Sequence, residues 1–549
     1  MGLLSRRTLV SLLGVCLLAG AARPLSDGLT PLGPEVVVNE NLSFTQRWGK
    51  VAMDPIGDRF ALAWSTVVFH DISLRFFDLE GTPTSAELLA NEFFQIKDQD
   101  EPMIAMDEFG NAFVCWTDRD SNDGDGIGVF GRVYDSAGQP MGPDFPISLT
   151  WMESQWEPMP KPLPGGGWVV AFNGDDDGEA YMRFMTVDGT PTSGDVNINT
   201  YHNNGQTEAE VDVSADGIVL TIYSDFGGNV MAGTATNLLA RRFNTNGVAL
   251  DPLEFVVNDS TLPFDQLEPR MAVSKLPAGQ GVFIIVWEDR GNDGDGDGIW
   301  ARRYDTTGQP LGPEWQVNVT TAGDQKLPEV AADHVGNFVV AWEDWSTGSA
   351  RILARCYDAN GASLGGEIVV SQGVPGIYER PQVAIDPSGE TILFTYSGPG
   401  LTGNPSPAQD KDIYLRRYAR PSLSLVDPPV IGGTFQLDLD LPGSAGHYYL
   451  VGASLGTSGI ALPDGRQWGL SLDTLFDHSL LYPSTGLPFL GFQGLLPPTA
   501  EATVAVVVPP NPALIGLPLH FAGLTLDLSQ FGLLKQLRHV TRTLTVTLQ

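Results

Sequence analysis

The chain has 549 residues, including 63 glycines and 40 prolines, and its formal net charge at pH 7 is −35. A chain of this length does not fold around a single hydrophobic core, and so negative a surface excludes binding to nucleic acid or to anionic membranes. Glycine and proline are abundant, 9% of the residues are aromatic, and long amphipathic stretches at helical spacing are missing. This balance predicts an all-β protein built from short strands.

The first 22 residues have the pattern of an export signal. Arg6 and Arg7 precede an apolar run from Thr8 to Leu18, and small residues follow at 19–21. This order is typical of a secretory signal peptide, so we expect residues 1–22 to be removed. The arginine pair fits either the general route or a twin-arginine route. No later stretch is long and apolar enough to span a bilayer. We therefore expect an exported protein, either secreted or held in the cell envelope or periplasm.

A repeated unit follows the signal. An apolar strand ending in an aromatic residue recurs at intervals of 51 to 64 residues, and an arginine recurs in the next strand. The aromatic positions are Trp64, Trp116, Phe172, Tyr223, Trp287, Trp342 and Tyr396. The arginines are Arg75, Arg132, Arg183, Arg241, Arg302, Arg355 and Arg416, and we expect them to form ion pairs between strands or blades with Asp118, Asp289 and Asp344. Units of four short strands, repeated seven times, are typical of a β-propeller.

The two ends of the repeat region predict how the ring closes. The seventh unit breaks at Pro421 without a fourth strand, and residues 31–39 match residues 310–318, the fourth strand of an earlier unit. An N-terminal strand that completes the last blade removes the open seam between the first and last blades. Residues 31–420 are therefore predicted to form a seven-bladed β-propeller closed by the N-terminal strand.

The tail has a different composition. Residues 421–549 are rich in leucine and proline, and polar and apolar residues alternate at 435–441 and 541–548. Such alternation predicts strands with one buried face. About 125 residues of this kind fit a β-sandwich domain.

Two sets of sequence runs, one in the repeats and one in the tail, resemble those of known groups of proteins. The Trp-Glu-Asp runs at 287–289 and 342–344, with Asp-Gly-Asp-Gly at 123–126 and 293–296, resemble uncharacterised bacterial propellers. Residues 510–516 and 524–527 resemble a C-terminal module of exported bacterial proteins. The resemblance implies an exported seven-bladed propeller with a C-terminal sandwich, and it implies no activity.

Two acidic loops are candidate calcium sites. Alternating Asp, Asn and Gly residues let a short loop place several oxygens around one Ca²⁺ ion. The candidate ligands are Asp118, Asp120, Asn122, Asp123 and Asp125 in one loop and Asp289, Asn292, Asp293, Asp295 and Asp297 in the other. The spacing lacks the glutamate of a helix-flanked calcium loop. The alternative is a pair of hydrated acidic turns.

A glutamine precedes the first strand of six units. These residues are Gln46, Gln99, Gln155, Gln206, Gln266 and Gln325, and Tyr378 stands at the seventh position. Acids follow closely at Glu101, Glu157, Glu208 and Glu268. The topology predicts that these positions surround the mouth of the central channel. They form either a polar rim that binds a ligand or a set of amides that ties the inner strands to their neighbours.

No catalytic constellation emerges from the sequence. His202 is the one histidine expected near the channel mouth, and Cys115 and Cys356, far apart in the repeats, are expected to be buried thiols. We therefore expect a non-catalytic binding protein whose Ca²⁺-stiffened face takes a glycan or an extracellular protein. The alternative is a carbohydrate-active enzyme, a glycoside hydrolase or polysaccharide lyase, that uses the same face.

Overall fold

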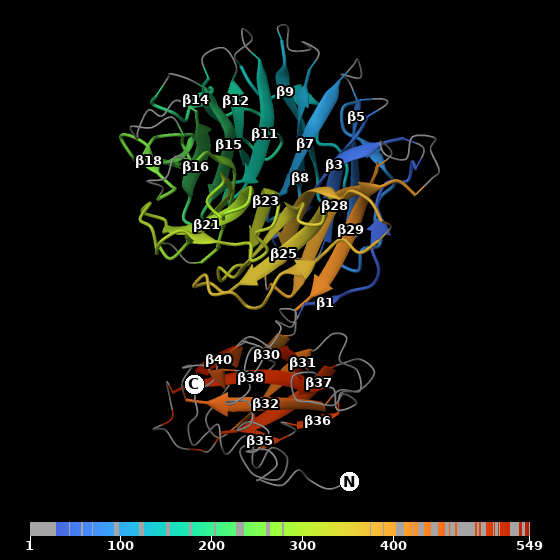
Figure 1. Cartoon of the computed structure of the whole chain (residues 1–549), viewed down its shortest axis with the longest axis vertical. Helices are drawn as coiled ribbons and strands as arrows, with labels where there is room; N and C mark the ends of the chain where they lie inside the picture. Colours follow the sequence, from blue (N-terminus) through green and yellow to red (C-terminus); the bar gives the residue numbers. More distant parts are fainter. Residues whose placement is uncertain are drawn as a thin grey trace. The chain divides into compact units, whose positions relative to one another are not determined.

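A computed structural model gives the structure of the chain (Figure 1). It describes residues 29–420 except 43, 56–58, 68–69, 93–97, 120–125, 150–153, 175–177, 202–204, 227–234, 260–263, 277–278, 374, 388 and 402–410, together with the strands and some connections of residues 422–547. The predicted signal peptide lies outside the described residues. No helix in the described part is long and apolar enough to cross a bilayer.

Seven antiparallel sheets follow one another along the chain, and in the first six the strands lie in sequence order. The first three are β3 (Gln46–Met53), β4 (Arg59–Thr66), β5 (Asp71–Asp78), β6 (Leu88–Leu89); β7 (Gln99–Met106), β8 (Ala112–Asp118), β9 (Gly128–Tyr134), β10 (Phe145–Pro146); and β11 (Gln155–Pro162), β12 (Trp168–Gly174), β13 (Ala180–Met185), β14 (Val196–Asn197). The next three are β15 (Gln206–Val213), β16 (Ile218–Asp225), β17 (Asn237–Asn244), β18 (Phe255–Val256); β19 (Gln266–Val273), β20 (Val282–Arg290), β21 (Asp297–Asp305), β22 (Trp315–Gln316); and β23 (Gln325–Ala332), β24 (Phe338–Asp344), β25 (Arg351–Tyr357), β26 (Ile368–Val369). The seventh contains β27 (Glu379–Ile385), β28 (Thr391–Pro399) and β29 (Lys411–Ala419).

The N-terminal strand completes the seventh sheet. β1 (Thr30–Pro31) and β2 (Val36–Val37) both pair antiparallel with β29, with Thr30 opposite Ala419 and Val36 opposite Leu415. In Figure 1 the blue N-terminal strand lies beside the orange β29. The predicted closure is confirmed, and the chain forms a seven-bladed β-propeller.

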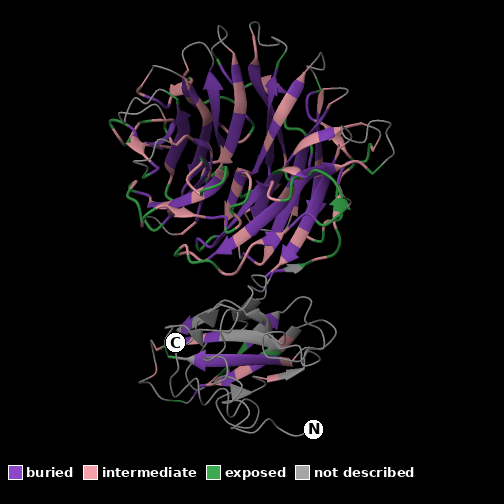
Figure 2. Cartoon of the chain, in the orientation of Figure 1, coloured by how far each residue is buried: buried purple, intermediate pink, exposed green. Residues whose placement is uncertain are grey.

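The aromatic column forms the cores between the blades. All seven aromatic side chains are fully buried, and buried residues, purple in Figure 2, make up most of each strand that carries them. Cys115 and Cys356 are buried thiols, as expected. Large rings spaced evenly around the ring of blades bury apolar area between neighbours, which stabilises each blade against the next.

The arginine column joins neighbouring blades through backbone carbonyls as well as through ion pairs. The Nη1 atoms of Arg75, Arg302 and Arg355 donate to backbone carbonyls of Val38, Val257 and Val317 in the preceding blade, at 2.8, 2.9 and 2.8 Å. Ion pairs, as predicted, link Arg75 to Glu40 and Arg132 to Glu92 at 2.7 Å each. Pairing with Asp118, Asp289 and Asp344 stays a prediction. A buried carbonyl needs a donor, and the planar guanidinium reaches it while stacking on the aromatic ring two residues further along.

Residues after the propeller form two main sheets. One contains β30 (Ser422–Leu425), β31 (Thr434–Asp440), β37 (Glu501–Val507) and β35 (Phe489–Leu490). The other contains β36 (Gln493–Leu495), β32 (Tyr448–Ser454), β38 (Pro518–Leu526), β39 (Leu537–Val540) and β40 (Leu544–Thr547). Phe435 and Leu437 of the first sheet and Val451 and Phe521 of the second belong to one buried cluster, which is the packing that the predicted sandwich requires.

Candidate binding site in the central channel

The six predicted glutamines are buried between the strands, and those described below form hydrogen bonds within and between blades. Each begins the innermost strand of its blade, and each side chain is at most 1% exposed. Gln266 donates from Nε2 to Asp289 Oδ2 at 3.1 Å, and its Oε1 accepts from Asn258 at 2.9 Å. Equivalent bonds join Gln99, Gln206 and Gln325 to an aspartate at the end of the second strand and to an asparagine of the preceding blade. A ligand-binding role for Gln46, Gln99, Gln155, Gln206, Gln266 and Gln325 stays a prediction.

Two residues after this position, every innermost strand bulges. In β19 the pairing with β20 skips from Leu267 to Arg270, and Glu268 adopts a φ of 49°. The same left-handed backbone occurs in all seven blades, at Trp48, Glu101, Glu157, Glu208, Glu268, Leu327 and Arg380. We call these seven residues the bulge ring. Proline follows five of them, and because proline cannot donate to a strand ladder, the sequence itself interrupts the pairing here.

In four blades, the N–H group of the bulge residue is bound by a side chain of the preceding blade. Glu268 N donates to Glu208 Oε2 at 2.7 Å, and Arg380 N donates to Glu343 Oε1 at 2.7 Å. Glu157 N donates to Thr117 Oγ1 at 3.0 Å. The bulge is therefore part of the scaffold, held by a bond between blades.

The side chains of the bulge ring, in contrast, differ around the channel mouth. Glu101, Glu157, Glu208 and Glu268 occupy four consecutive blades, as the sequence predicted. On the other side, the Arg380 guanidinium lies 5.5 Å from the centre of the Trp48 ring. The mouth thus has an acidic arc opposite an aromatic and cationic one.

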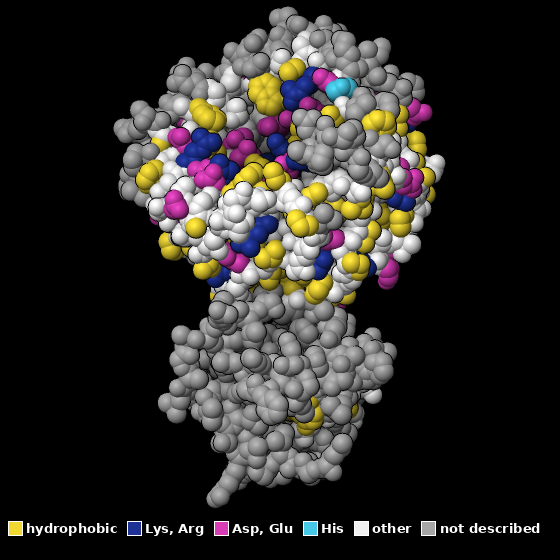
Figure 3. All heavy atoms as spheres, turned by 45° about the vertical axis from the view of Figure 1, so that its right-hand side comes forward, with side chains coloured by type: hydrophobic (Ala, Val, Ile, Leu, Met, Phe, Trp, Pro, Cys, Tyr) yellow, Lys and Arg dark blue, Asp and Glu magenta, His cyan; other side chains and the backbone are white. Residues whose placement is uncertain are grey.

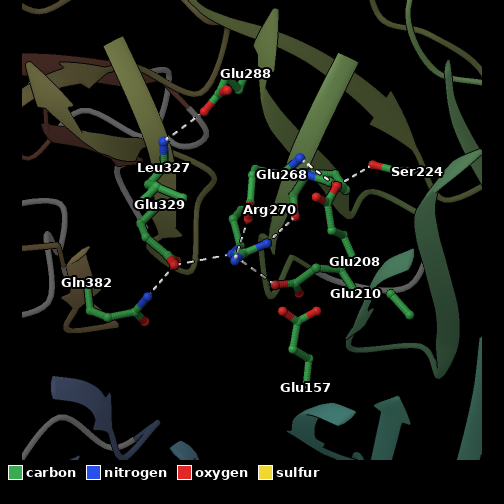
Figure 4. Close-up of polar contacts among 12 residues, drawn as sticks. Glu157, Glu208, Glu210, Ser224, Glu268, Arg270, Glu288, Leu327, Glu329 and Gln382 are labelled. Atoms are coloured by element: carbon green, nitrogen blue, oxygen red, sulfur yellow. Dashed lines mark hydrogen bonds and ion pairs between the residues drawn. The ribbon is translucent and has the colours of Figure 1, made fainter. Parts of the chain in front are cut away.

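Two of the four carboxylates are bound by neutral donors, whereas the other two face arginines. Glu101 pairs with Arg119 at 3.1 Å, and Glu268 pairs with Arg270 at 3.3 Å. Asn173 Nδ2 donates to Glu157 Oε2 at 2.9 Å, and the Ser224 hydroxyl donates to Glu208 (Figure 4). Among the described residues, neither Glu157 nor Glu208 forms an ion pair.

Burial raises the pKa values of these two carboxyls, Glu157 and Glu208. It raises the pKa of Glu157 to about 7, and the neighbouring charges of Glu101 and Glu268 add to the effect. Burial, with repulsion from Glu268, also raises the pKa of Glu208. Removing a carboxylate from water and placing it near others disfavours its charged form.

Arg270 lies in the channel, where three carboxylates surround it. Arg270 contacts Glu329 through Nε at 3.2 Å, Glu210 at 3.6 Å and Glu268 through Nη2 at 3.3 Å (Figure 4). Burial lowers the pKa of its guanidinium, but the surrounding carboxylates outweigh burial, so the pKa is raised and the charge is permanent. Burial likewise raises the pKa of Glu210 to about 7, although Arg270 and Lys161 oppose the shift.

Arg270, with Met103 and Met159, separates two hollows of the channel. We call the hollow at the bulge ring the upper chamber; it measures about 70 Å³ and includes Trp48, Glu157 and Glu208 in its lining. The second, the lower chamber, measures about 240 Å³ and lies toward the ends of the innermost strands. The space-filling view in Figure 3 shows a hollowed face in which acidic and basic side chains gather.

The acidic loops are only partly described. Asp120, Asn122, Asp123 and Asp125 lie outside the described residues, as does His202, and Asp118 is fully buried. In the other loop, Asn292 N donates to Asp289, Asn318 donates to Asp293, and Lys326 pairs with Asp297 at 3.0 Å, while Asp295 is exposed. Within the described part of the chain, no three or more His, Cys, Asp or Glu side chains are grouped to hold a metal ion. Calcium binding stays a prediction.

Fold and channel define a closed seven-bladed β-propeller with an asymmetric, charged centre. No protein-family model matches the chain, and no curated protein is significantly similar to it in sequence. Among solved structures, a protein of unknown function from Dyadobacter fermentans is 12% identical, with a TM-score of 0.42 over 71% of this chain and 99% of that one. Hydrazine synthase of Kuenenia stuttgartiensis is 15% identical, with a TM-score of 0.42 over 63% of this chain and 91% of that one. Polysaccharide lyase Uly1 is 10% identical, with a TM-score of 0.42 over 66% of this chain and 88% of that one. At these identities the likeness concerns the fold and not the activity.

Proposed function

We propose that this is an exported, non-catalytic binding protein that takes one end of a glycan into the upper chamber. The observation that carries the proposal is the arrangement of the bulge ring. Three of its four glutamates, Glu101, Glu157 and Glu208, line one small hollow together with the Trp48–Arg380 pair.

Symmetry separates the bulge ring from the scaffold. The bulge, its backbone bond and the buried glutamines recur from blade to blade, as a structural device should. The side chains of the bulge ring recur only in part, because glutamate stands in four blades and tryptophan, leucine and arginine stand in the other three. A left-handed conformation by itself favours glycine or asparagine. Four glutamates, a tryptophan and an arginine at such positions are not explained by backbone preference. Residues held in costly conformations are concentrated at functional sites.

The chemistry of the ring suits a sugar. An aromatic face binds the apolar face of a pyranose, and carboxylates accept hydrogen bonds from hydroxyl groups. Trp48 is half-buried and so keeps part of its ring available. Because the upper chamber measures only about 70 Å³, it takes a terminal group while the rest of the ligand lies outside.

A glycoside hydrolase is the second candidate, and one observation favours it. Burial raises the pKa of Glu157 to about 7, and Glu101 and Glu208 flank it in the neighbouring blades. A protonated carboxyl beside an ionised one is the pair that acid-catalysed glycoside hydrolysis uses.

The test uses the chain without residues 1–22. An oligosaccharide array, followed by titration calorimetry of any hit, measures binding to the wild type and to Trp48→Ala and Glu208→Gln. We expect each substitution to weaken binding about tenfold or more. Glu80→Gln, at an exposed position of the first blade, is the matched control and leaves binding unchanged. Equal binding by all three variants would contradict the proposal.

The same hits separate binding from hydrolysis. Each is incubated with the protein, and the products are analysed by chromatography. Intact ligand after incubation supports a binding protein. Cleavage that Glu157→Gln abolishes supports the hydrolase.

Calcium is proposed to stiffen the acidic loops of the second and fifth blades. Packed carboxylates repel one another unless a cation neutralises them. Adding EDTA should lower the melting temperature, and Asp293→Asn with Asp295→Asn should remove part of that effect. A melting curve that EDTA leaves unchanged would contradict calcium binding.

A further inference from the structure

The lower chamber has a wall that differs from the rest of the channel. Six residues after the glutamine position, the innermost strands carry alanine in five blades. The third and fourth blades carry Lys161 and Asp212 instead, and both line the lower chamber with Lys275 and His334. Lysine and aspartate interrupt an otherwise apolar layer only on this side.

The ion pairs between the lysines and the aspartate of this wall are long. Lys161 Nζ lies 3.6 Å from Asp212 Oδ2, and Lys275 Nζ lies 4.0 Å from Asp212 Oδ1. Both distances exceed the upper limit of about 3.2 Å for a good N–H···O bond. Lys275 also donates to the Val213 carbonyl at 2.7 Å. Since each ammonium has three donors, both lysines retain hydrogen-bonding capacity toward the chamber.

The wall formed by Lys161, Asp212 and Lys275 carries two positive charges and one negative charge. Of the other carboxylates that line the chamber, Glu210 and Glu329 face Arg270, and Asp54 faces Arg59 at 3.8 Å. Asp212 is the carboxylate nearest to both Lys161 and Lys275, and the more distant Glu210 and Glu329 also raise the pKa of Lys161. Two lysines around one aspartate are unusual in a chain whose net charge is −35. Burial, together with the charge of Lys161, lowers the pKa of Lys275, which is the cost that a bound anion would relieve.

We propose that the lower chamber binds a small hydroxylated carboxylate of about the size of a sugar acid. Its carboxylate lies between Lys161 and Lys275, and a hydroxyl donates to Asp212. The alanine layer on the opposite side, which includes Ala52, Ala331 and Ala384, covers the carbon skeleton. The volume of about 240 Å³ exceeds the roughly 150 Å³ of a cavity that holds benzene. This site is separate from the upper chamber and does not depend on the glycan proposal.

The test measures binding of D-glucuronate, D-glucose and acetate to the mature chain by titration calorimetry. Glucuronate should bind, and glucose, which lacks the carboxylate, should bind about tenfold more weakly or not at all. Acetate, which lacks the hydroxyls and the carbon skeleton, should also bind weakly. Equal affinity for glucuronate and glucose, or for glucuronate and acetate, would overturn the proposal, as would the absence of glucuronate binding.

Variants place the site. Lys161→Met and Lys275→Met should each weaken glucuronate binding about tenfold, whereas Lys275→Arg, which keeps the charge, should retain most of it. Lys326→Met is the matched control, because this lysine pairs with Asp297 and Asp324 outside the chamber. If Lys275→Met does not fold, Lys161→Met and Lys275→Arg decide the question. Unchanged binding in Lys161→Met, or an equal loss in Lys326→Met, would overturn the proposal. Trp48→Ala, in the upper chamber, should leave glucuronate binding intact.

Discussion

The glutamine positions and the bulge ring lie two residues apart in every blade, yet they differ in kind. The glutamines are buried and make nearly the same bonds in blade after blade. The bulge ring has one backbone conformation but four kinds of side chain, and five of its seven residues line the upper chamber. In a repeat protein, a position that recurs together with its bonds belongs to the scaffold. A position that recurs in conformation alone is free to carry function.

Gln266→Leu should give the largest effect. It removes the donor to Asp289 Oδ2 and the acceptor for Asn258, and it leaves the Asp289 carboxylate, which is 2% exposed, without that partner. We expect the free energy of unfolding to fall by about 3 kcal/mol, measured by urea denaturation. Glu268→Gln, two residues further along, should change it by about 0.5 kcal/mol or less. Comparable losses in the two variants would remove the distinction between scaffold and ring.

The pH dependence of stability sharpens the comparison. The folded protein raises the pKa of Glu157 to about 7, above the value of about 4.3 in an unfolded chain, so the folded state binds the proton more tightly. The contribution of Glu157 to stability is complete below pH 4 and is lost as the pH rises toward 7. Glu157→Gln should therefore remove a slope of up to about 1.4 kcal/mol per pH unit between pH 5 and 7.

The measurement is the free energy of unfolding at pH 5, 6, 7 and 8 for the wild type and the variant. Glu80→Gln, on an exposed glutamate, should run parallel to the wild type. Because burial also raises the pKa values of Glu210 and Glu288 to about 7, some slope remains in Glu157→Gln. If the free energies of unfolding of Glu157→Gln and the wild type change in parallel from pH 5 to pH 8, this carboxyl titrates normally and the prediction is wrong.

Repetition explains which features were predictable from the sequence. Blade number and closure follow from aligned columns, and the four glutamates were placed near the mouth because they follow the glutamines closely. The carbonyl acceptors of the arginine column were missed because a recurring backbone carbonyl leaves no mark in the sequence. Arg270, Lys161 and Asp212 were missed for another reason. The bulge shifts the alternation of inward and outward positions, so simple period-two counting fails beyond it. The prolines after the bulge were the available signal.

The smallest effect tests whether the bulge-ring conformation is costly in itself. Leu327 has a φ of 49°, a conformation that is sterically unfavourable for alanine but not for glycine. Leu327→Gly should therefore be more stable than Leu327→Ala by about 1 kcal/mol. Four residues further along the same strand, Ala331 is a natural alanine that lies outside the set of left-handed residues. There the order should reverse, and Ala331→Gly should lose about 0.5–1 kcal/mol. Urea denaturation of the three variants and the wild type measures both differences. If alanine proved as stable as glycine at position 327, the backbone of the bulge ring would carry no strain, and only the identity of its side chains would remain as evidence of function.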